Sequence, residues 1–151
     1  MATALNTGHI GLNVTDLDVS VAFYQRLFGF EARTGGRDGQ AEWAFLSRDG
    51  RLVLTLWRQS AGVFDTGAPG LHHLSFQVDT LDEVRAVEAN LRELGLTPRH
   101  GGAVPHGEGA DSGGVFFTDP DGIRLEVYTP AGLAEDTAAK PAGDAPTCGF
   151  F

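Results

Sequence analysis

The sequence predicts an α+β fold built from a duplicated βαβββ module, whose two copies form a cupped, mostly antiparallel sheet of eight strands. Residues 9–18 recur 64 positions later as residues 73–82, and residues 49–54 recur 72 positions later as residues 121–126. Each copy passes from an alternating strand pattern into a helical pattern that ends at glycine. Two copies are too few for a solenoid, so the repeat predicts one duplicated domain.

This single domain is expected to cover residues 1–130, with module one at 8–57, a linker at 58–70 and module two at 71–130. The rise of the repeat offset from 64 to 72 indicates that module two contains the longer connection. The last residues, 131–151, begin with a stretch rich in Ala, Pro, Asp and Thr, which predicts a tail.

Module one has clear signals for each of its first elements. Residues 9–14 alternate His, Gly and Asn with Ile, Leu and Val, the pattern of a half-buried strand. Asp16 is a good N-cap for the helix that follows, and Gly29 stands just beyond its last apolar residue. Residues 41–47 and 51–57 are predicted strands, joined by an Asp-Gly turn.

Module two repeats this order. The strand at 73–78 is followed by Thr80 and Glu83, which form a capping box for a helix that ends before Gly95. Two further strands are expected at 115–118 and 123–128, with a Pro-Asp-Gly turn between them.

Composition excludes several classes of function. The chain has 11 Lys and Arg against 20 Asp and Glu, a net charge of −9, which disfavours binding to nucleic acid. The longest strongly apolar stretch, 52–57, is too short to cross a membrane, and the first residues do not resemble a signal peptide. The single cysteine, Cys148, cannot form an intrachain disulfide. We therefore expect a cytoplasmic protein that acts on or binds a small molecule.

Strand alternation predicts where the chemistry lies. The apolar face of each strand should pack against the helices, so the polar faces should line the concave side of the sheet. His9, His73 and Glu126 all fall on polar faces, and the two histidines occupy equivalent positions of the repeat. Two imidazoles and one carboxylate form a facial triad that binds a divalent metal and leaves positions open. The residues expected to line the substrate cavity share these faces: Ser75, Gln77, Arg124 and Tyr128.

Each assignment has a structural alternative. A strand histidine is often merely exposed, and Arg124 is equally suited to pair with a neighbouring carboxylate. In the alternation of this strand His72 falls on the same face as the apolar residues Leu74 and Phe76, so we expect it to have a structural role. The glycine-rich segment 100–114 is predicted to be a mobile lid that carries His106 as a catalytic proton carrier, whereas a solvated loop is the alternative for His106 and His100.

These segments resemble a known family. HIGLNVTDL at 9–17, HLSFQV at 73–78 and DPDGIRLEVY at 119–128 are similar to motifs of the vicinal oxygen chelate superfamily. It includes glyoxalase I, bleomycin-resistance proteins, extradiol dioxygenases, fosfomycin-resistance enzymes and methylmalonyl-CoA epimerase. The resemblance covers residues 8–130 and implies metal ligands at His9, His73 and Glu126. Because related single-domain proteins commonly pair across chains, we also expect this chain to form a homodimer.

Departures from the family pattern reduce the number of reactions that the resemblance allows. The offset of 72 pairs Glu126 with Leu54, so the fourth ligand of glyoxalase I and of the epimerase is missing. Bleomycin-binding relatives lack the metal site. The complete triad of this chain therefore disfavours a function limited to sequestration. The extradiol dioxygenases are most similar, although Phe116 stands where they usually have Tyr. They also have an additional histidine before the second metal ligand, and residues 55–70 of this chain contain none.

Three functions remain open from the sequence. The first is an extradiol-type dioxygenase that uses Fe(II), the favoured metal, on a vicinal diol or hydroxyketone. The second is a redox-neutral lyase, isomerase or thiol transferase with Mn(II), Ni(II) or Zn(II) as a Lewis acid. The third is a protein that sequesters a drug or metabolite.

Overall fold

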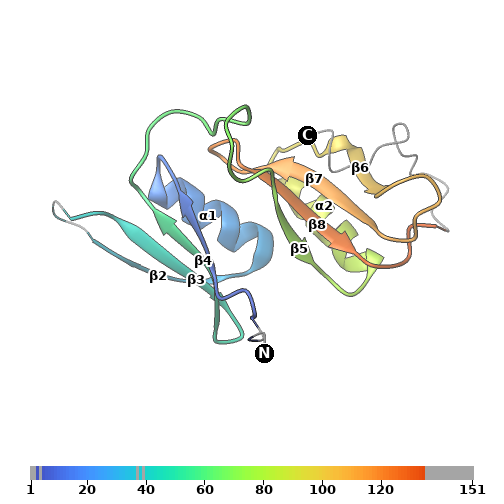
Figure 1. Cartoon of the computed structure of the whole chain (residues 1–151), viewed down its shortest axis with the longest axis horizontal. Helices are drawn as coiled ribbons and strands as arrows, with labels where there is room; N and C mark the ends of the chain where they lie inside the picture. The colour runs from blue at the N-terminus through green and yellow to red at the C-terminus, as the bar shows by residue number, and fades with distance from the viewer. Residues whose placement is uncertain (1–2, 4, 37, 39, 135–151) are drawn as a thin grey trace. The chain divides into compact units, whose positions relative to one another are not determined.

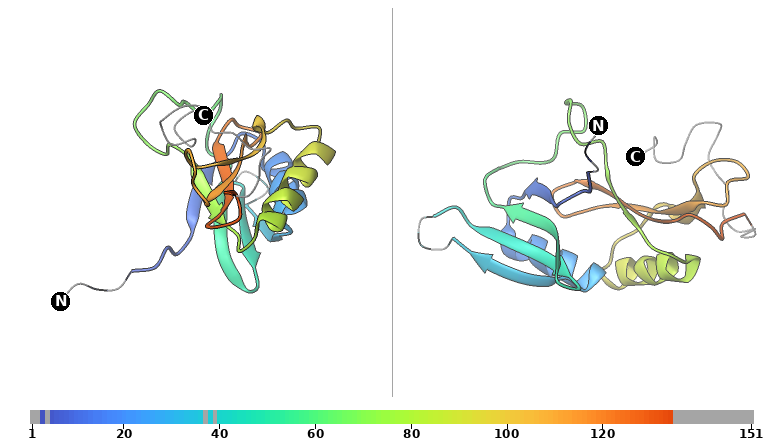
Figure 2. Two further views of the ribbon diagram at one scale, coloured as in Figure 1. Left: turned by 90° about the vertical axis from the view of Figure 1, so that its right-hand side faces the viewer. Right: turned by 60° about the horizontal axis from the view of Figure 1, so that its bottom comes forward.

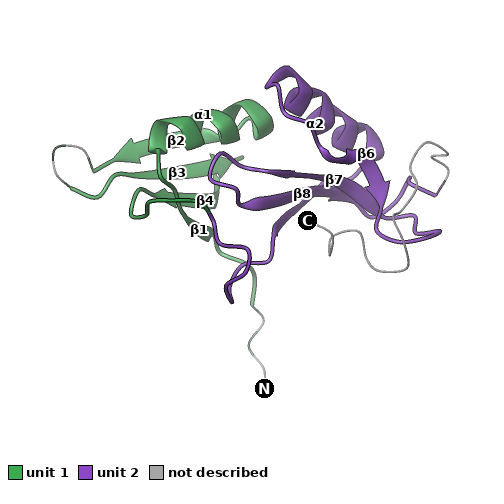
Figure 3. Ribbon diagram, turned by 90° about the horizontal axis from the view of Figure 1, so that it is seen from above, with its two compact units in different colours: residues 1–63 green, residues 64–151 purple. Residues whose placement is uncertain are grey.

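The computed structural model describes residues 3, 5–36, 38 and 40–134 as two compact units, residues 1–63 and 64–151. Within the described residues, each unit has one helix and one four-stranded sheet, so the predicted duplication of a βαβββ module is confirmed. Figure 3 distinguishes the two units by colour. The boundary between the units falls inside the predicted linker. Most of the predicted tail, residues 135–151 with Cys148, lies outside the described residues.

Unit 1 contains β1 (Ile10–Asn13), α1 (Leu17–Phe28), β2 (Glu31–Gly35), β3 (Trp43–Arg48) and β4 (Arg51–Trp57) (Figure 1). The strand order is β1-β4-β3-β2, with β1 parallel to β4 and the other pairs antiparallel.

Helix α1 begins and ends where the sequence predicts. The Asp16 side chain accepts a hydrogen bond from the Val19 amide at 3.0 Å, and Gly29 ends the helix in the left-handed conformation with φ of 68°. The helix contacts β3 and β4, whose buried residues on that face include Ala44 and Leu46. The opposite face of the sheet is left for polar and aromatic side chains.

Unit 2 contains β5 (Leu74–Gln77), α2 (Leu81–Glu93), β6 (Arg99–Pro105), β7 (Gly113–Thr118) and β8 (Arg124–Thr129), in the order β5-β8-β7-β6. The predicted capping box of Thr80 and Glu83 is present at the start of α2. In both views of Figure 2, α2 lies beside its sheet, and it contacts β7 and β8. Val115 and Val127, a buried cross-strand pair, lie on the apolar face of this sheet.

The segment 100–114 differs from its predicted form. Much of it forms the antiparallel hairpin of β6 and β7, in which Pro105 pairs with Gly113. A Cβ atom at Gly114 would collide with the carbonyl oxygen of Val127. This glycine therefore allows close packing of strands, and the prediction of a lid over the whole segment was wrong. The turn between the two strands is confined to residues 106–112.

Within the described parts of the chain, no helix is long and apolar enough to cross a membrane.

Candidate functional site

The polar face of unit 2 is defined by the parallel pairing of β5 with β8. Ser75 pairs with Glu126 and Gln77 pairs with Tyr128, so these side chains share one face of the sheet. The alternating residues Leu125 and Val127 are buried on the other face, as strand alternation predicted.

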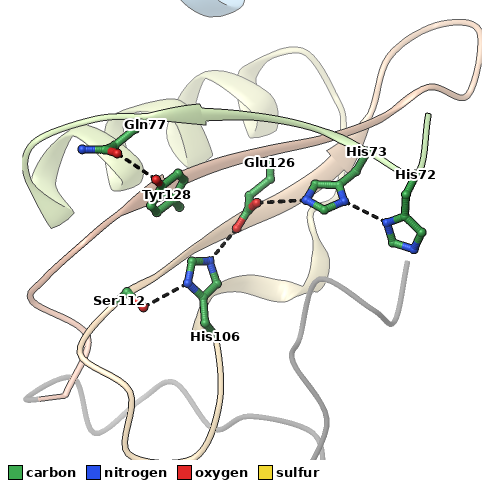
Figure 4. Close-up of polar contacts among 7 residues, drawn as sticks. All are labelled: His72, His73, Gln77, His106, Ser112, Glu126 and Tyr128. Carbon is green, nitrogen blue, oxygen red and sulfur yellow. Dashed lines mark hydrogen bonds and ion pairs between the residues drawn. The ribbon is translucent and has the colours of Figure 1, made fainter. Parts of the chain in front are cut away.

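Glu126 lies at the centre of this face, although it is only 3% exposed. Its Oε1 is 2.6 Å from Nε2 of His106, and its Oε2 is 3.4 Å from Nε2 of His73 (Figure 4). Because a carboxylate only accepts hydrogen bonds, His106 donates its Nε2–H to Glu126. A side-chain hydrogen bond joins Ser75 to the same carboxyl group.

These partners set the ionisation of Glu126. Burial raises the pKa of its carboxyl group, whereas the hydrogen bonds from His106 and Ser75 and the electrostatic attraction of the His106 and His73 side chains lower it. The lowering effects are together larger, so the pKa lies below its ordinary value of 4.5. Glu126 is therefore an anion at neutral pH.

His106 is held at both ring nitrogens. Its Nδ1 lies 3.0 Å from the Ser112 hydroxyl, and its backbone N–H donates to the Ser112 carbonyl oxygen at 2.9 Å. Since Nε2 carries the proton that faces Glu126, the Nδ1 of neutral His106 accepts a hydrogen bond from the Ser112 hydroxyl. The rings of Tyr128 and Phe116 flank the imidazole, with centroids at 5.4 and 6.4 Å. The other candidate proton carrier, His100, is exposed, and its ring meets the Phe116 ring edge-on.

His72 lies beside His73 and not in the core. It is exposed, and its Nδ1 is 2.8 Å from Nδ1 of His73, so one of the two nitrogens carries a hydrogen and donates a hydrogen bond to the other. The prediction that His72 is structural assumed that strand alternation extends back to residue 72. Strand β5 begins only at Leu74, which explains the different orientation. His72 therefore contacts the nitrogen of His73 that points away from Glu126 (Figure 4).

His9 occupies the position in unit 1 that His73 occupies in unit 2. It immediately precedes β1, as His73 immediately precedes β5, and its side chain is exposed. Among the described residues, no three His, Cys, Asp or Glu side chains are grouped so as to hold a metal ion.

The His73 and Glu126 donors are nevertheless spaced as metal ligands. Ligand nitrogen and oxygen atoms lie about 2.1 Å from a divalent metal, so two adjacent donors of one ion are about 3 Å apart. The 3.4 Å between Nε2 of His73 and Oε2 of Glu126 is close to that separation. An imidazole and a carboxylate are also the donor types expected of a divalent transition-metal site. This pair therefore fits as part of such a site.

The other predicted substrate-binding residues lie on the same face. The Tyr128 hydroxyl donates to Oε1 of Gln77 at 2.7 Å, which fixes both side chains. Arg124 lies two residues before Glu126 on β8 and pairs with Thr118 of β7. Strand register thus puts Ser75, Gln77, Arg124 and Tyr128 on the face of the sheet that carries Glu126.

The position equivalent to Glu126 in unit 1 is Thr55 and not Leu54. Thr55 pairs with Gly11 and Phe45, as Glu126 pairs with Ser75 and Phe116. The offset of 72 holds at the hairpin turn, but an irregularity in the β3–β4 ladder adds one residue and reduces the offset to 71. Thr55 is buried, and its hydroxyl accepts a hydrogen bond from the Trp57 indole at 3.1 Å. Like leucine, threonine supplies no carboxylate there.

The sequence matches the family model described as "Glyoxalase/Bleomycin resistance protein/Dioxygenase superfamily" over residues 6–127. It is 30% identical over 124 residues to catechol-2,3-dioxygenase of Bacillus subtilis, a match that covers 80% of this chain and 40% of that protein. The chain therefore spans less than half the length of this relative.

Two crystal structures have the same fold. A glyoxylase/bleomycin resistance protein/dioxygenase domain from Frankia sp. EAN1pec has a TM-score of 0.71 and 25% identity, and the match covers 84% of this chain and 98% of that one. The fosfomycin resistance protein FosX from Listeria monocytogenes, in complex with Mn(II) and sulfate, has a TM-score of 0.60 and 23% identity, with 85% and 93% covered.

Proposed function

This chain belongs to the Glyoxalase/Bleomycin resistance protein/Dioxygenase superfamily, and on that premise we propose that it is a divalent-metal-dependent enzyme acting on small molecules. The observation that supports this most is the approach of His73 and His106 to the two oxygens of the buried, ionised Glu126. The reaction we propose is extradiol-type dioxygenation of a vicinal diol or hydroxyketone.

In this proposal His73, Glu126 and His9 hold the metal. His73 and Glu126 are within 3.4 Å of each other, and His9 has the equivalent place in the other module, in the same chain or in a second copy. A bound divalent metal supplies Lewis acidity, which lowers the pKa of a substrate hydroxyl. Fe(II) is the metal we favour because it is the ion typical of facial triads with dioxygenase chemistry.

His106 is the proton carrier in this proposal. Phe116 lies opposite Glu126 but has no hydroxyl, so it cannot take part in proton transfer. His106 donates its Nε2–H to Glu126, which fixes its tautomer, and its Nδ1 faces the Ser112 hydroxyl. Because Nε2 already carries a proton, Nδ1 is the atom that takes up the proton of a substrate hydroxyl: Ser112 gives its own proton to Nδ1 and receives that of the substrate, and the reverse transfer returns the proton to the product.

The chain's own polar residues then orient the substrate. Ser75, Gln77 and Tyr128 lie on the same face as Glu126, and the Gln77–Tyr128 hydrogen bond limits the rotamers of both side chains. The likeness to catechol-2,3-dioxygenase favours a diol as the group that is oriented.

Reconstitution tests this function directly. Protein purified without chelator is stripped of metal and refilled anaerobically with Fe(II), Mn(II), Ni(II) or Zn(II), and oxygen uptake is measured on a panel of catechols. We expect uptake with Fe(II). Turnover without oxygen uptake would indicate a redox-neutral lyase, isomerase or thiol transferase, and tight binding without turnover would indicate sequestration.

The variant His106→Ala tests the proton carrier. We expect turnover to fall by about 100-fold or more at unchanged metal content. His100→Ala is the matched control, because His100 is an exposed histidine on the same hairpin. Equal activity of the two variants would contradict the role of His106.

A further inference from the structure

Unit 2 contains a pocket of about 400 Å³ at one end of its polar face, lined in part by Arg99, Arg124, Thr66, Thr97 and Thr118. Small-molecule sites in proteins have volumes of roughly 300–1,000 Å³. The pocket is therefore large enough for part of a small substrate.

Strand pairing places the two arginines on the face that carries Glu126. Arg99 of β6 pairs with Phe116 of β7, and Phe116 pairs in turn with Glu126 of β8. Arg124 lies two residues from Glu126, which corresponds to about 7 Å along a strand. Paired residues of neighbouring strands point to the same side of a sheet, so both guanidinium groups lie on the Glu126 side.

The charge of this pocket is opposite to that of the chain. The whole sequence carries a net charge of −9, yet the described residues that line the pocket include two arginines and no Asp or Glu. Guanidinium groups bind carboxylate and phosphonate groups through paired hydrogen bonds, and threonine hydroxyls donate further ones. An oxyanion is thus the ligand that this set of side chains suits.

We infer that this pocket is an anion subsite and that the substrate carries a carboxylate or phosphonate group. Its identity as a substrate subsite rests on the proposed function, since the anion would lie about 7 Å along β8 from Glu126. A small ring-containing molecule with a diol at one end and an acidic group at the other has the required form.

Binding is measured on the metal-free full chain with benzoate, phenylphosphonate and the neutral analogue benzamide. Amide chemical shifts in NMR spectra, at low ionic strength, report both the affinity and the place of binding. We expect saturable shifts around Arg99, Thr118 and Arg124 with at least one of the two anions, and about tenfold or more weaker binding of benzamide. The anion that binds with the higher affinity identifies the preferred acidic group.

Arg99→Gln and Arg124→Gln should each weaken anion binding by about 10–100-fold. Arg85→Gln on α2 is the matched control, because it removes the same charge from an exposed helix position. Equal binding of benzoate, phenylphosphonate and benzamide, or wild-type affinity in both pocket variants, would overturn the inference. The measurement needs no metal and no turnover, so a chain without diol-cleaving activity would leave this result standing, and the two proposals fail separately.

Discussion

Removal of His106 should destabilise the metal-free protein in a way that depends on the charge of Glu126. The His106 imidazole donates to Oε1 of Glu126 at 2.6 Å, and the Glu126 side chain is only 4% exposed. His106→Ala therefore leaves a buried carboxylate with one donor fewer. Because the lost donor is one of the groups that lower the pKa of Glu126, that pKa rises in the variant.

A hydrogen bond to a charged group contributes about 1.5–3 kcal/mol to stability. The His106 side chain is 27% exposed, so water partly replaces the bond and the lower part of this range applies. We expect His106→Ala to reduce the free energy of unfolding by about 2 kcal/mol at neutral pH. Ser112→Ala, which removes the neutral partner of the same ring, should cost about 1 kcal/mol or less.

The pH dependence has a defined sign. The folded pKa of Glu126 is lowered, so its contribution is complete above its ordinary value of 4.5 and is lost as the pH falls through the folded pKa. The difference in the free energy of unfolding between the wild type and His106→Ala should therefore become smaller at acidic pH. In the Glu126→Gln background, His106→Ala should cost clearly less than in the wild type, because no charge remains.

Urea unfolding followed by far-UV circular dichroism, with chelator present, measures these differences. A cost below about 0.5 kcal/mol at neutral pH would show that the bond does not stabilise the fold. A cost that is equal in the wild-type and Glu126→Gln backgrounds would show that the carboxylate is not the partner that matters.

Three further results are expected. His72→Ala should weaken metal binding by about 10–100-fold at unchanged stability, because His72 contacts Nδ1 of His73, the ring nitrogen that points away from Glu126. His100→Ala is the control, and equal metal affinity of the two variants in a chelator competition would refute this expectation. Thr80→Ala should lower the free energy of unfolding by about 1 kcal/mol without changing metal content, because it removes the capping box of α2; unchanged urea midpoints would contradict it. The chain should sediment as a homodimer, and a monomer at micromolar concentration would contradict that expectation.

Much of the fold could be predicted because its signals are local. Asp16 and Gly29 bound α1, and Thr80 with Glu83 begins α2, since a cap depends on residues within one helical turn. Strand alternation also placed Glu126 on the face opposite the helix. The strand β6 was missed because Gly101 and Gly102 within it resemble a loop. In the neighbouring strand β7, Gly114 is required by the close approach of β8.

Parts of the site depend on contacts that no sequence pattern contains. The ring of His106 reaches Glu126, twenty positions later, only because the hairpin of β6 and β7 brings the two together. The orientation of His72 depends on where β5 begins, and an alternation pattern locates that point only to within a few residues. The assignment of Leu54 was wrong because one extra residue in the β3–β4 ladder shifts the register, and a gapless repeat alignment cannot place such an insertion.

Metal content measured on protein purified without chelator tests the proposed metal site directly. We expect a divalent metal in the wild type and in His100→Ala. In His73→Ala and Glu126→Gln we expect metal binding to be weakened by about 10–100-fold or more, since each substitution removes a ligand and the second removes the anionic one. Circular dichroism confirms that each variant is folded. Wild-type metal content in folded His73→Ala and Glu126→Gln would show that these residues do not bind the metal.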